Sequence, residues 1–406
     1  MAQVVNTNIL SLNAQRNLNS SQGALATSLE RLSSGLRINS AKDDAAGLAI
    51  SERFTTQIRG LNQAVRNAND GISFAQTAEG ALSTVGDALQ RIRELAVQSA
   101  NDTNSASDRQ ALNNEVQQLS AEIGRVATST EFNGARILDG SLQDLFFQVG
   151  ANQGQTIAVS GVDARSSQLG ATEVTSALAL SQAEINGGLT FDGALTINVA
   201  DGSDAGLDIE VALSGITNFE DAVSAINSAI RDSAASDTTG AVSSAGLTAA
   251  LRVDNQGGTS IVITGAFDAE FTANNAGTVT YTNADGDATD AALFAVGASS
   301  EAVNINEINV SSRENAYQTI AAVDGALTQI NTLRSELGAV QIRFESTISN
   351  LSVSAENLSA ARSRIRDADF AAETAELTRS QILQQAGISV LAQANATPQS
   401  VLALLQ

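Results

Sequence analysis

The chain has 406 residues, contains no cysteine and no histidine, and carries 22 basic against 44 acidic side chains. Without these two residue types there can be no disulfide, no Ser-His-Asp triad and no zinc site with the usual His or Cys ligands. The formal net charge of -22 argues against a nucleic-acid partner, because few cations are available to neutralise phosphates. The sequence has no apolar run of about 18 residues, so no membrane insertion is expected.

The acidity is concentrated in the middle of the chain. Residues 1–175 hold 13 basic and 17 acidic side chains, residues 176–310 hold 2 and 18, and residues 311–406 hold 7 and 9. The middle is rich in Gly, Thr and Asp, whereas the ends are rich in Leu, Ala, Gln and Asn. Such a shift in composition indicates domain boundaries. We therefore expect a helical body formed by both ends and an acidic domain inserted between them.

A leucine seam marks residues 1–38, in surroundings of Asn, Gln, Ser and Ala. A helix of this composition is marginal on its own and needs a partner surface. Two interpretations stay open: the two ends of the chain pair in an intramolecular helical hairpin, or they become ordered only in an assembly. The seam consists of Leu18, Leu25, Leu29, Leu32 and Leu36.

Two further helices are predicted in the N-terminal third. Apolar residues alternate at spacings of three and four over residues 58–89. A second apolar face at Val85 and Ile92 predicts that this helix packs on two sides. The segment NDTNSASD at 101–108 predicts a turn. The helix expected over 112–126 would then run antiparallel to the first.

The middle of the chain has the patterns of short strands and one helix. A β-hairpin is predicted from 145–149 and 156–160, which flank the turn GANQG. Residues 177–309 combine several alternating strand patterns with helical spacing over 219–230. This region is therefore predicted to be an inserted α+β domain with a strongly acidic surface.

The C-terminal part carries the clearest apolar repeat. A capping-box match at Ser311 and Glu314 predicts the start of a helix. Six apolar residues then follow at intervals of seven, which predicts a seam facing a partner helix. These are Ile330, Leu337, Phe344, Leu351, Leu358 and Ile365. A looser seam follows at Phe370, Leu377, Leu383 and Leu391.

Two charged motifs invite a chemical interpretation. The acidic run at 283–290 fails the EF-hand pattern, because Ala288 and Phe294 stand where that loop requires Gly and Glu. An acidic turn is the preferred interpretation. The trio Lys42–Asp44 could be catalytic, but acidic residues also suit a helix N-terminus. No site here supports an enzyme, and no metal or cofactor is expected.

Both ends of the chain resemble bacterial flagellin. The resemblance covers about residues 1–170 and 312–406, and the middle is the part in which flagellins vary. Its motifs are VNTN at 5–8, LSSGLRINSAKDDAAGL at 32–48, RNANDGIS at 66–73, LQRIRELAVQSAN at 89–101, SRIRDADFAAET at 363–374, LQQAG at 383–387 and LAQAN at 391–395.

The resemblance implies a structural subunit that self-assembles into the helical flagellar filament used for swimming. It implies coiled-coil inner-tube helices at 1–42 and 366–406, a helical-bundle layer at 43–176 and 310–365, and a variable outer domain at 177–309. The expected fold class is mainly α. The two arms pair into a long coiled-coil bundle with a β-hairpin, and an α+β outer domain is inserted.

The resemblance also implies a location and partners. Flagellins leave the cell through the flagellar type III export channel without a cleaved signal peptide, so an extracellular filament is expected. Expected partners are further copies of the chain, an export chaperone at the C-terminus, and the filament cap and hook-junction proteins. A host Toll-like receptor is expected to recognise Arg91, Leu95 and Glu115, which match the family's receptor motif. Arg91 and Leu95 lie four positions apart, on one helical face.

Two alternatives to a filament subunit are less well supported by the sequence. A hook–filament junction protein would resemble flagellin mainly at the ends, but it would diverge in motifs that this chain keeps, such as residues 40–44. An enzymatic flagellin with a metalloprotease in its middle domain would need zinc ligands, and the chain has no histidine to supply them.

Overall fold

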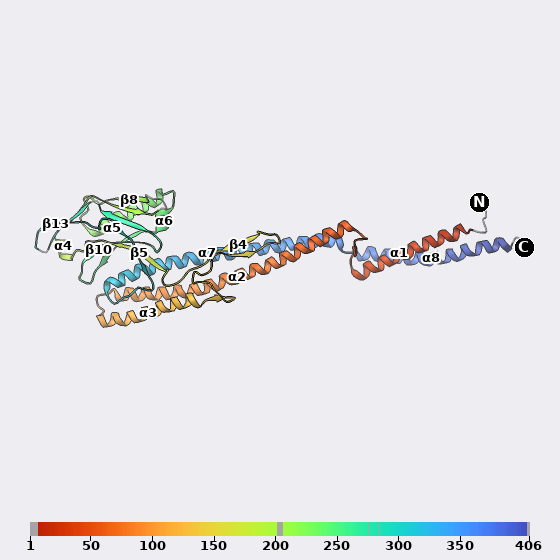
Figure 1. Cartoon of the computed structure of the whole chain (residues 1–406), viewed down its shortest axis with the longest axis horizontal. Helices are drawn as coiled ribbons and strands as arrows, with labels where there is room; N and C mark the ends of the chain where they lie inside the picture. The colour runs from red at the N-terminus through yellow and green to blue at the C-terminus, as the bar shows by residue number, and fades with distance from the viewer. Residues whose placement is uncertain (1–6, 201–205, 276, 284, 404–406) are drawn as a thin grey trace. The chain divides into compact units, whose positions relative to one another are not determined.

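The computed structural model describes residues 7–200, 206–275, 277–283 and 285–403. The chain divides into two compact units, and the long helices α2 (Ala45–Ser99) and α7 (Arg313–Arg366) contribute to both (Figure 1). The first unit comprises residues 1–69, 148–157 and 345–406, and the second comprises 70–147 and 158–344.

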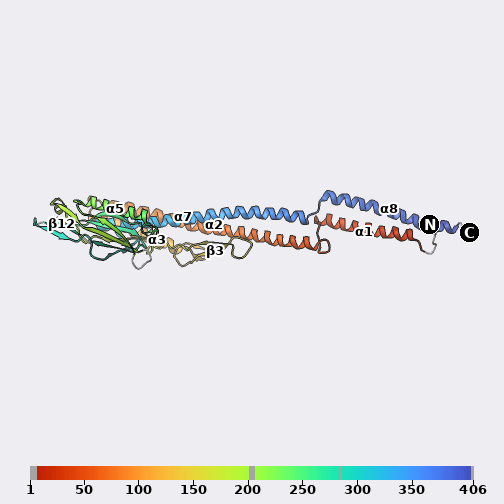
Figure 2. The ribbon, with the colours of Figure 1, turned by 90° about the horizontal axis from the view of Figure 1, so that it is seen from above.

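The first unit contains two pairs of helical segments. Helices α1 (Ile9–Ser34) and α8 (Phe370–Ala403) lie side by side in both views (Figures 1 and 2). The segments of α2 and α7 in this unit share a small apolar cluster in which Leu61, Ala64 and Leu351 are buried and Leu358 is packed against them. The heptad seam predicted from the sequence therefore holds α7 against α2 here.

In the second unit, α2 and α7 run antiparallel beside α3 (Ala106–Ser129). The direction follows from two contacts: Arg93 Nε lies 2.6 Å from Asp324 Oδ1, and the Gln341 amide donates to Glu79 at 2.9 Å. The predicted seam fills the core of this bundle. Its buried members include Leu82, Leu89, Ile92, Val116, Ile123, Ile330 and Leu337.

Helix α3 begins at the turn that the sequence predicts. The Ser105 hydroxyl accepts a hydrogen bond from the Asp108 backbone N–H at 3.2 Å, while the Asp108 carboxylate accepts from the Ser105 N–H at 3.0 Å. This reciprocal capping box satisfies two of the orphan donors at the helix start. The Ser105 hydroxyl also donates to the Asp108 carboxylate at 2.7 Å, and this bond, together with the one from the Ser105 N–H, holds the pKa of Asp108 below its usual value.

Two hairpins follow α3, and the second one confirms the sequence prediction. The first joins β1 (Glu131–Phe132) to β2 (Ala135–Arg136). The second joins β3 (Leu145–Gln148) to β4 (Thr156–Val159).

Four phenylalanines from these hairpins and the long helices form an aromatic cluster. The ring centroids of Phe74 and Phe132 are 5.7 Å apart, those of Phe147 and Phe344 are 5.5 Å apart, and both pairs are edge-to-face. This geometry suits the quadrupoles of the rings. Phe344 is fully buried, and its Cζ would lie 2.5 Å from a Cβ at Gly71. Only glycine leaves room for the ring.

The inserted domain contains three sheets among its described residues, with the strand orders β15-β5-β10-β9, β14-β11-β7-β8 and β13-β12-β6. Neighbouring strands are antiparallel throughout. The strands are β5 (Gly170–Thr175), β6 (Leu189–Asp192), β7 (Ala194–Val199), β8 (Leu207–Ala212), β9 (Thr248–Val253), β10 (Thr259–Ala266), β11 (Phe271–Asn275), β12 (Thr278–Thr282), β13 (Ala288–Ala291), β14 (Ala298–Ser299) and β15 (Glu301–Asn304).

Helix α5 (Phe219–Ser236) packs against β8 and β9, and shorter helices lie at α4 (Gln182–Asn186) and α6 (Ala241–Ala245). The N-cap of α5 is Asn218, whose side chain accepts from the Asp221 N–H at 2.6 Å. The apolar face of α5 enters one core with the strands around it. Phe191 and Phe294 are among the largest buried side chains of that core.

The capping box predicted at Ser311 and Glu314 is wrong. The Ser311 hydroxyl donates instead to Asn309 Oδ1 at 2.9 Å. The Ser312 hydroxyl accepts from the Asn315 backbone N–H at 3.2 Å and caps α7. The cap lies one residue later because Asn309 engages the first of the two serines.

The fold class expected from the sequence is confirmed: the chain is mainly helical, its two arms pack together, and an α+β domain is inserted. The division into domains stays a prediction. Strand β5 precedes the boundary predicted at residue 176, but it pairs with β10, which follows that boundary.

The acidic run at 283–290 connects β12 to β13. The backbone N–H of Asn283 donates to the Asp287 carbonyl at 2.9 Å, and Gly286 takes the positive φ of 87° that this tight connection requires. Ala284 in this run lies outside the described residues. Over the part of the chain that the structure describes, no helix has a stretch long and apolar enough to cross a membrane.

Replacing Phe344 tests the aromatic cluster. We expect Phe344→Ala to lower the free energy of unfolding by about 3–5 kcal/mol, because it leaves a cavity among the other rings. Ile342→Ala is the matched control, since this neighbour on α7 is 68% exposed, and we expect it to cost about 0.5 kcal/mol or less. Urea unfolding followed by circular dichroism measures both. Equal losses would show that the cluster does not support the bundle.

Candidate functional site: the paired terminal helices

The two terminal helices are held together at both ends of their contact. The Asn8 side-chain amide donates to the Ala394 carbonyl at 2.8 Å. At the opposite end, Arg31 Nη1 lies 3.8 Å from a Glu373 carboxylate oxygen. Because Asn8 precedes Arg31 and Glu373 precedes Ala394, the helices are antiparallel. The structure thus pairs the two ends within one chain, and whether they become ordered only in an assembly stays a prediction.

Small side chains fill the interior of this pair. Ala14 and Ser28 of α1 and Ser380 and Ala394 of α8 are each exposed by 7% or less. On α8, a Cβ at Gly387 would lie 3.4 Å from the Leu18 side chain. Small residues let the two helix backbones approach closely, but they also leave little interior volume for large side chains.

The leucine seam predicted from the sequence is consequently not the buried interior of the pair. Six of its members are half-buried at the edges of the contact: Leu18, Leu25, Leu32, Leu36, Leu377 and Leu391. The other three are exposed: Leu29 by 49%, Phe370 by 58% and Leu383 by 51%.

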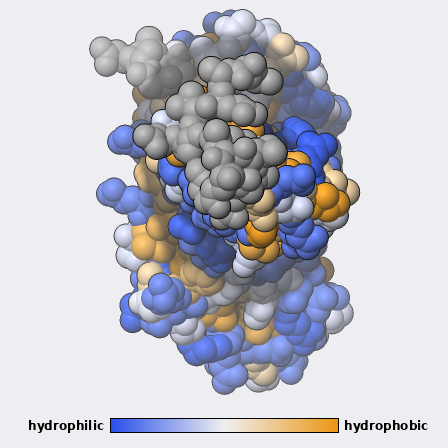
Figure 3. All heavy atoms as spheres, turned by 90° about the vertical axis from the view of Figure 1, so that its right-hand side faces the viewer, coloured by the Kyte–Doolittle hydropathy of each residue, from blue (hydrophilic) through white to orange (hydrophobic). Residues whose placement is uncertain are grey.

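Further large apolar side chains on the same helices are exposed, and sequence reasoning missed them. We call the set found among the described side chains the terminal apolar surface. It consists of Ile9, Leu10, Leu12, Leu29, Phe370, Ile382, Leu383, Ile388 and Val390. Figure 3 faces the end at which the two helices lie and shows apolar side chains among hydrophilic ones.

A signal for the terminal apolar surface is present in the sequence of α8. Its residues Ile382, Leu383, Ile388, Val390 and Leu391 point in all directions around a 3.6-residue helix, so they form no single seam. A helix that is apolar all round is normally buried on all sides. One partner, α1, cannot cover it.

A short connection joins α1 to α2 beside the α7–α8 junction. The backbone N–H of Arg37 donates to the Arg366 carbonyl at 2.7 Å, and the Ala368 N–H donates to the Gly35 carbonyl at 3.0 Å. The Arg37 guanidinium also donates to the Ile365 carbonyl. Hydrogen bonds between backbone atoms therefore hold the α1–α2 connection against the α7–α8 junction.

The charged trio Lys42–Asp44 lies in this connection and organises it. Asp43 Oδ2 accepts from the backbone N–H of Ser40 at 2.8 Å and of Asn39 at 3.1 Å. The hydrogen bond from Ser40 is the main cause that lowers the pKa of Asp43. Asp44 Oδ1 accepts from the Gly47 N–H at 2.8 Å, which caps α2. These bonds favour a helix-start role for the trio over a catalytic one.

The three residues expected to contact a receptor lie on α2 and α3. Arg91 Nε donates to Glu115 Oε1 at 2.9 Å, and both side chains are about half exposed. Hydrogen bonds to Glu94 and Glu115 raise the pKa of Arg91. Leu95 is only 1% exposed and lies in the bundle core. The structure thus brings Arg91 and Glu115 together at the surface and turns Leu95 inward.

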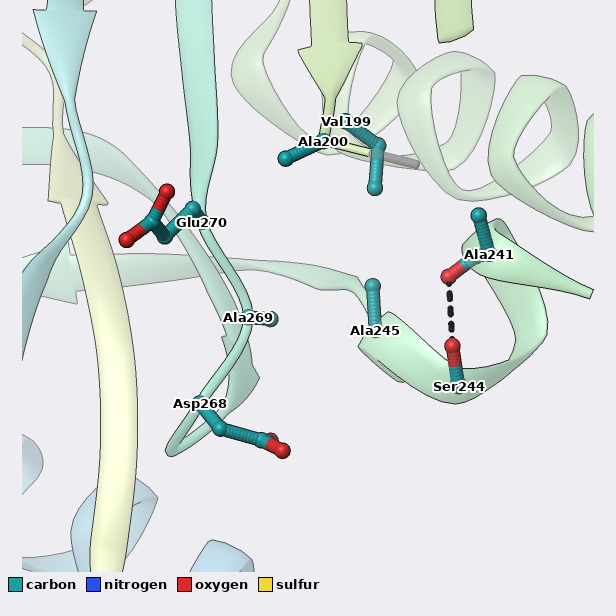
Figure 4. Close-up of a pocket in the computed structure, with 8 residues that line it drawn as sticks. All are labelled: Val199, Ala200, Ala241, Ser244, Ala245, Asp268, Ala269 and Glu270. Atoms are coloured by element: carbon teal, nitrogen blue, oxygen red, sulfur yellow. Dashed lines mark hydrogen bonds between the residues drawn. The ribbon is translucent and has the colours of Figure 1, made fainter. Parts of the chain in front are cut away.

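The outer domain has a hollow of about 210 Å³ between α6, the end of β7 and the turn before β11 (Figure 4). Two carboxylates, Asp268 and Glu270, line it, and the Ser244 hydroxyl donates within its own helix to the Ala241 carbonyl. Among the described residues, no group of three or more His, Cys, Asp or Glu side chains could hold a metal ion.

Comparison with known proteins places the chain in a family. The family model for the bacterial flagellin N-terminal helical region matches residues 5–143, and the C-terminal helical region matches residues 320–405. Flagellin of Salmonella typhimurium is 41% identical over an alignment that covers all of both chains, and B-type flagellin of Pseudomonas aeruginosa is 39% identical with the same coverage. The chain belongs to the bacterial flagellin family.

The flagellin matches decide between the main role predicted from the sequence and its first alternative. Full-length similarity to flagellins confirms a structural subunit of the flagellar filament and favours it over a hook–filament junction protein. Among solved structures, FliC from Burkholderia pseudomallei is 22% identical, with 67% of this chain and 99% of that chain covered at a TM-score of 0.36.

Asp43→Ala tests the connection between α1 and α2. Removal of this acceptor should make backbone amides of residues 39–40 exchange with solvent several-fold faster, as measured by hydrogen–deuterium exchange. The pKa of Asp43 is lowered, so the native contact is present above the ordinary aspartate pKa of about 3.9 and is lost as the pH falls through the lower folded value. The experiment is therefore done near pH 7.

Lys42→Ala is the control for this experiment, because Lys42 is the exposed neighbour in the same connection. It should leave the exchange of residues 39–40 unchanged. Equal acceleration in both variants would contradict the role given to Asp43.

Proposed function

We propose that copies of this flagellin assemble through the terminal apolar surface and that the paired α1 and α8 helices form the inner tube of the filament. One observation carries the proposal: nine large apolar side chains of these helices are about half exposed or more, while small residues fill the interior of the pair. Burying one such side chain contributes about 1.5–3 kcal/mol. Several of them together offset the entropy lost on association.

The arrangement of the terminal apolar surface suits an open polymer. A surface patch that contacts a different patch on the next copy gives a heterologous contact, which extends as a helix unless its rotation closes a ring. Because α8 exposes apolar residues around its circumference, it can contact more than one neighbour. We assign inner-tube helices to residues 1–42 and 366–406, of which residues 1–6 and 404–406 lie outside the described part.

The distribution of charge along the chain supports the other two predicted layers of the filament. We assign the surrounding bundle layer to residues 43–176 and 310–365 and the outer layer to 177–309. The near-neutral arms tolerate close packing between copies, whereas the outer domain carries 18 acidic and 2 basic side chains within residues 176–310. Facing solvent, this charge keeps neighbouring filaments apart.

Export and assembly partners are part of the proposal. The chain leaves the cell unfolded through the flagellar type III channel, without a cleaved signal peptide. An export chaperone covers the apolar residues of the C-terminal helix before assembly. Outside the cell, the filament cap and the hook-junction proteins form the boundaries of the filament. The lack of cysteine supports this route, because no disulfide can form on arrival in an oxidising exterior.

A host Toll-like receptor contacts Arg91 and Glu115 at the surface of the second unit, and Leu95 supports this site from the core. The protein acts through such contacts and not as an enzyme. The family it belongs to is one of structural proteins, and no constellation described above supplies a nucleophile with a base.

Leu383→Asp tests the terminal apolar surface. We expect the monomer to keep its helix content, because Leu383 is 51% exposed, and we expect no long filaments, because a carboxylate would be buried against the next copy. Electron microscopy after salt-induced polymerisation measures the result. Gln385→Asp, an exposed polar position two residues further on α8, controls for added charge and should still polymerise. Filaments of normal length from Leu383→Asp would remove α8 from the assembly contact.

Arg91→Ala tests the receptor contact in purified monomer. Loss of the Arg91–Glu115 pair from the surface should reduce receptor signalling in reporter cells by about tenfold or more, a loss in the range of an interface hot spot. Arg125→Ala is the control, because Arg125 forms a similar exposed pair with Glu122 on α3. Leu95→Asp is unsuitable on its own, since a buried charge would also disrupt the bundle. Equal signalling by both arginine variants would exclude Arg91.

A further inference from the structure

We propose that the outer domain is fixed directly on α7 by its strand β5, so that the outer domain and the helical bundle of the second unit unfold as one cooperative unit. The inference concerns the single chain and does not depend on how copies assemble. It starts from the composition of the second unit, which joins residues 158–344 with residues 70–147 in one compact body.

The first element of this attachment is a glycine on α7. A Cβ at Gly325 would overlap the backbone carbonyl oxygen of Gly170 and lie 3.0 Å from the Ala171 side chain. The helix backbone and the strand backbone therefore touch with no side chain between them. Glycine in the middle of a helix costs stability relative to alanine, and here its absence of a side chain is what allows β5 to reach α7.

Two glutamines of α7 hold β5 on either side of this glycine. The Gln329 side chain accepts a hydrogen bond from the Gly170 backbone N–H at 3.2 Å. The Gln318 amide donates to Glu173 Oε1 at 2.8 Å. Gln318, Gly325 and Gln329 are separated by seven and four residues, so all three lie on one face of the helix. This face follows β5 along most of its length.

A buried ion pair extends the attachment across the sheet. Glu173 on β5 pairs through both carboxylate oxygens with the guanidinium of Arg252 on β9, and both side chains are less than 10% exposed. Strand β10 lies between β5 and β9 and pairs with both. Separation of Gln318 from Glu173 would leave the buried Glu173 carboxylate without one of its hydrogen bonds. Such a loss is costly in a region of low dielectric constant.

The start of α7 makes a second attachment to the same sheet. The Arg313 guanidinium donates to the Asp254 backbone carbonyl at 2.5 Å, directly after β9, and also to the Asp102 carboxylate at 2.6 Å in the turn before α3. One side chain thus joins the outer domain to the bundle. With contacts at the start of α7 and along the face that carries Gly325, the outer domain does not pivot on a flexible linker.

Gly325→Ala in the full chain tests the proposal, with Gly338→Ala as its matched control. Both glycines lie inside α7, but a Cβ at Gly338 meets nothing within 4 Å. Gly338→Ala should raise the melting temperature by about 2–4 °C, because alanine favours helix. Gly325→Ala should lower it instead, because the new methyl group separates β5 from α7. Circular dichroism checks that both variants keep their helix content.

Hydrogen exchange measured at increasing urea concentrations tests whether the outer domain and α7 unfold together. In the native sequence, peptides from β10 and from residues 316–330 of α7 should lose protection at the same urea concentration. In Gly325→Ala, the β10 peptides should lose protection at a lower concentration than the α7 peptides. Gln318→Ala, which cannot clash, should shift β10 in the same direction by a smaller amount.

Three results would overturn the proposal. The first is separate loss of protection for β10 and α7 in the native sequence. The second is a rise in melting temperature for Gly325→Ala equal to that of Gly338→Ala. The third is unchanged protection of β10 relative to α7 in both Gly325→Ala and Gln318→Ala.

Discussion

The close approach of α1 and α8 is the constraint on which the candidate function depends. Because Ala14, Ser28, Ser380 and Ala394 occupy the interior of the pair, the larger apolar residues have no place inside it. The single chain therefore satisfies its backbone hydrogen bonds but leaves much apolar side-chain surface in water. A pair of leucine-filled helices would have been more stable alone, and it would have had less reason to associate with other copies.

The long elements could be predicted from the sequence because their periodicity is repeated many times. The heptad positions from Ile330 to Leu351 are buried, as the pattern predicts. The start of α7 could not be placed, because Ser311 and Ser312 are equivalent in sequence and only the contact of Ser311 with Asn309 distinguishes them. A match to the capping-box spacing cannot show which of two neighbouring serines the nearby Asn309 side chain engages.

The candidate site was predicted less completely than the fold. A search for recurring leucines identified Leu29 and Leu383. It missed Ile382, which lies off their face, and Val390, which is not a leucine although it follows Leu383 by seven residues and lies on the same face of α8. Likewise, a spacing of four residues places Arg91 and Leu95 on successive turns of α2, but it does not show which of the two side chains faces the core. Burial depends on where α3 and α7 pack, and that is a property of the tertiary structure.

The connection between α1 and α2 has a practical consequence for biochemistry. Lys42 is the only lysine in the chain, and it is exposed in the turn that Asp43 organises. A lysine-specific protease therefore has one cleavage site, and it coincides with the end of the segment assigned to the inner tube. A single cut would break the covalent link between α1 and α2 and would leave the chain of the bundle and the outer domain intact. Susceptibility to this cut before and after polymerisation would report directly on whether the turn becomes enclosed by neighbouring subunits.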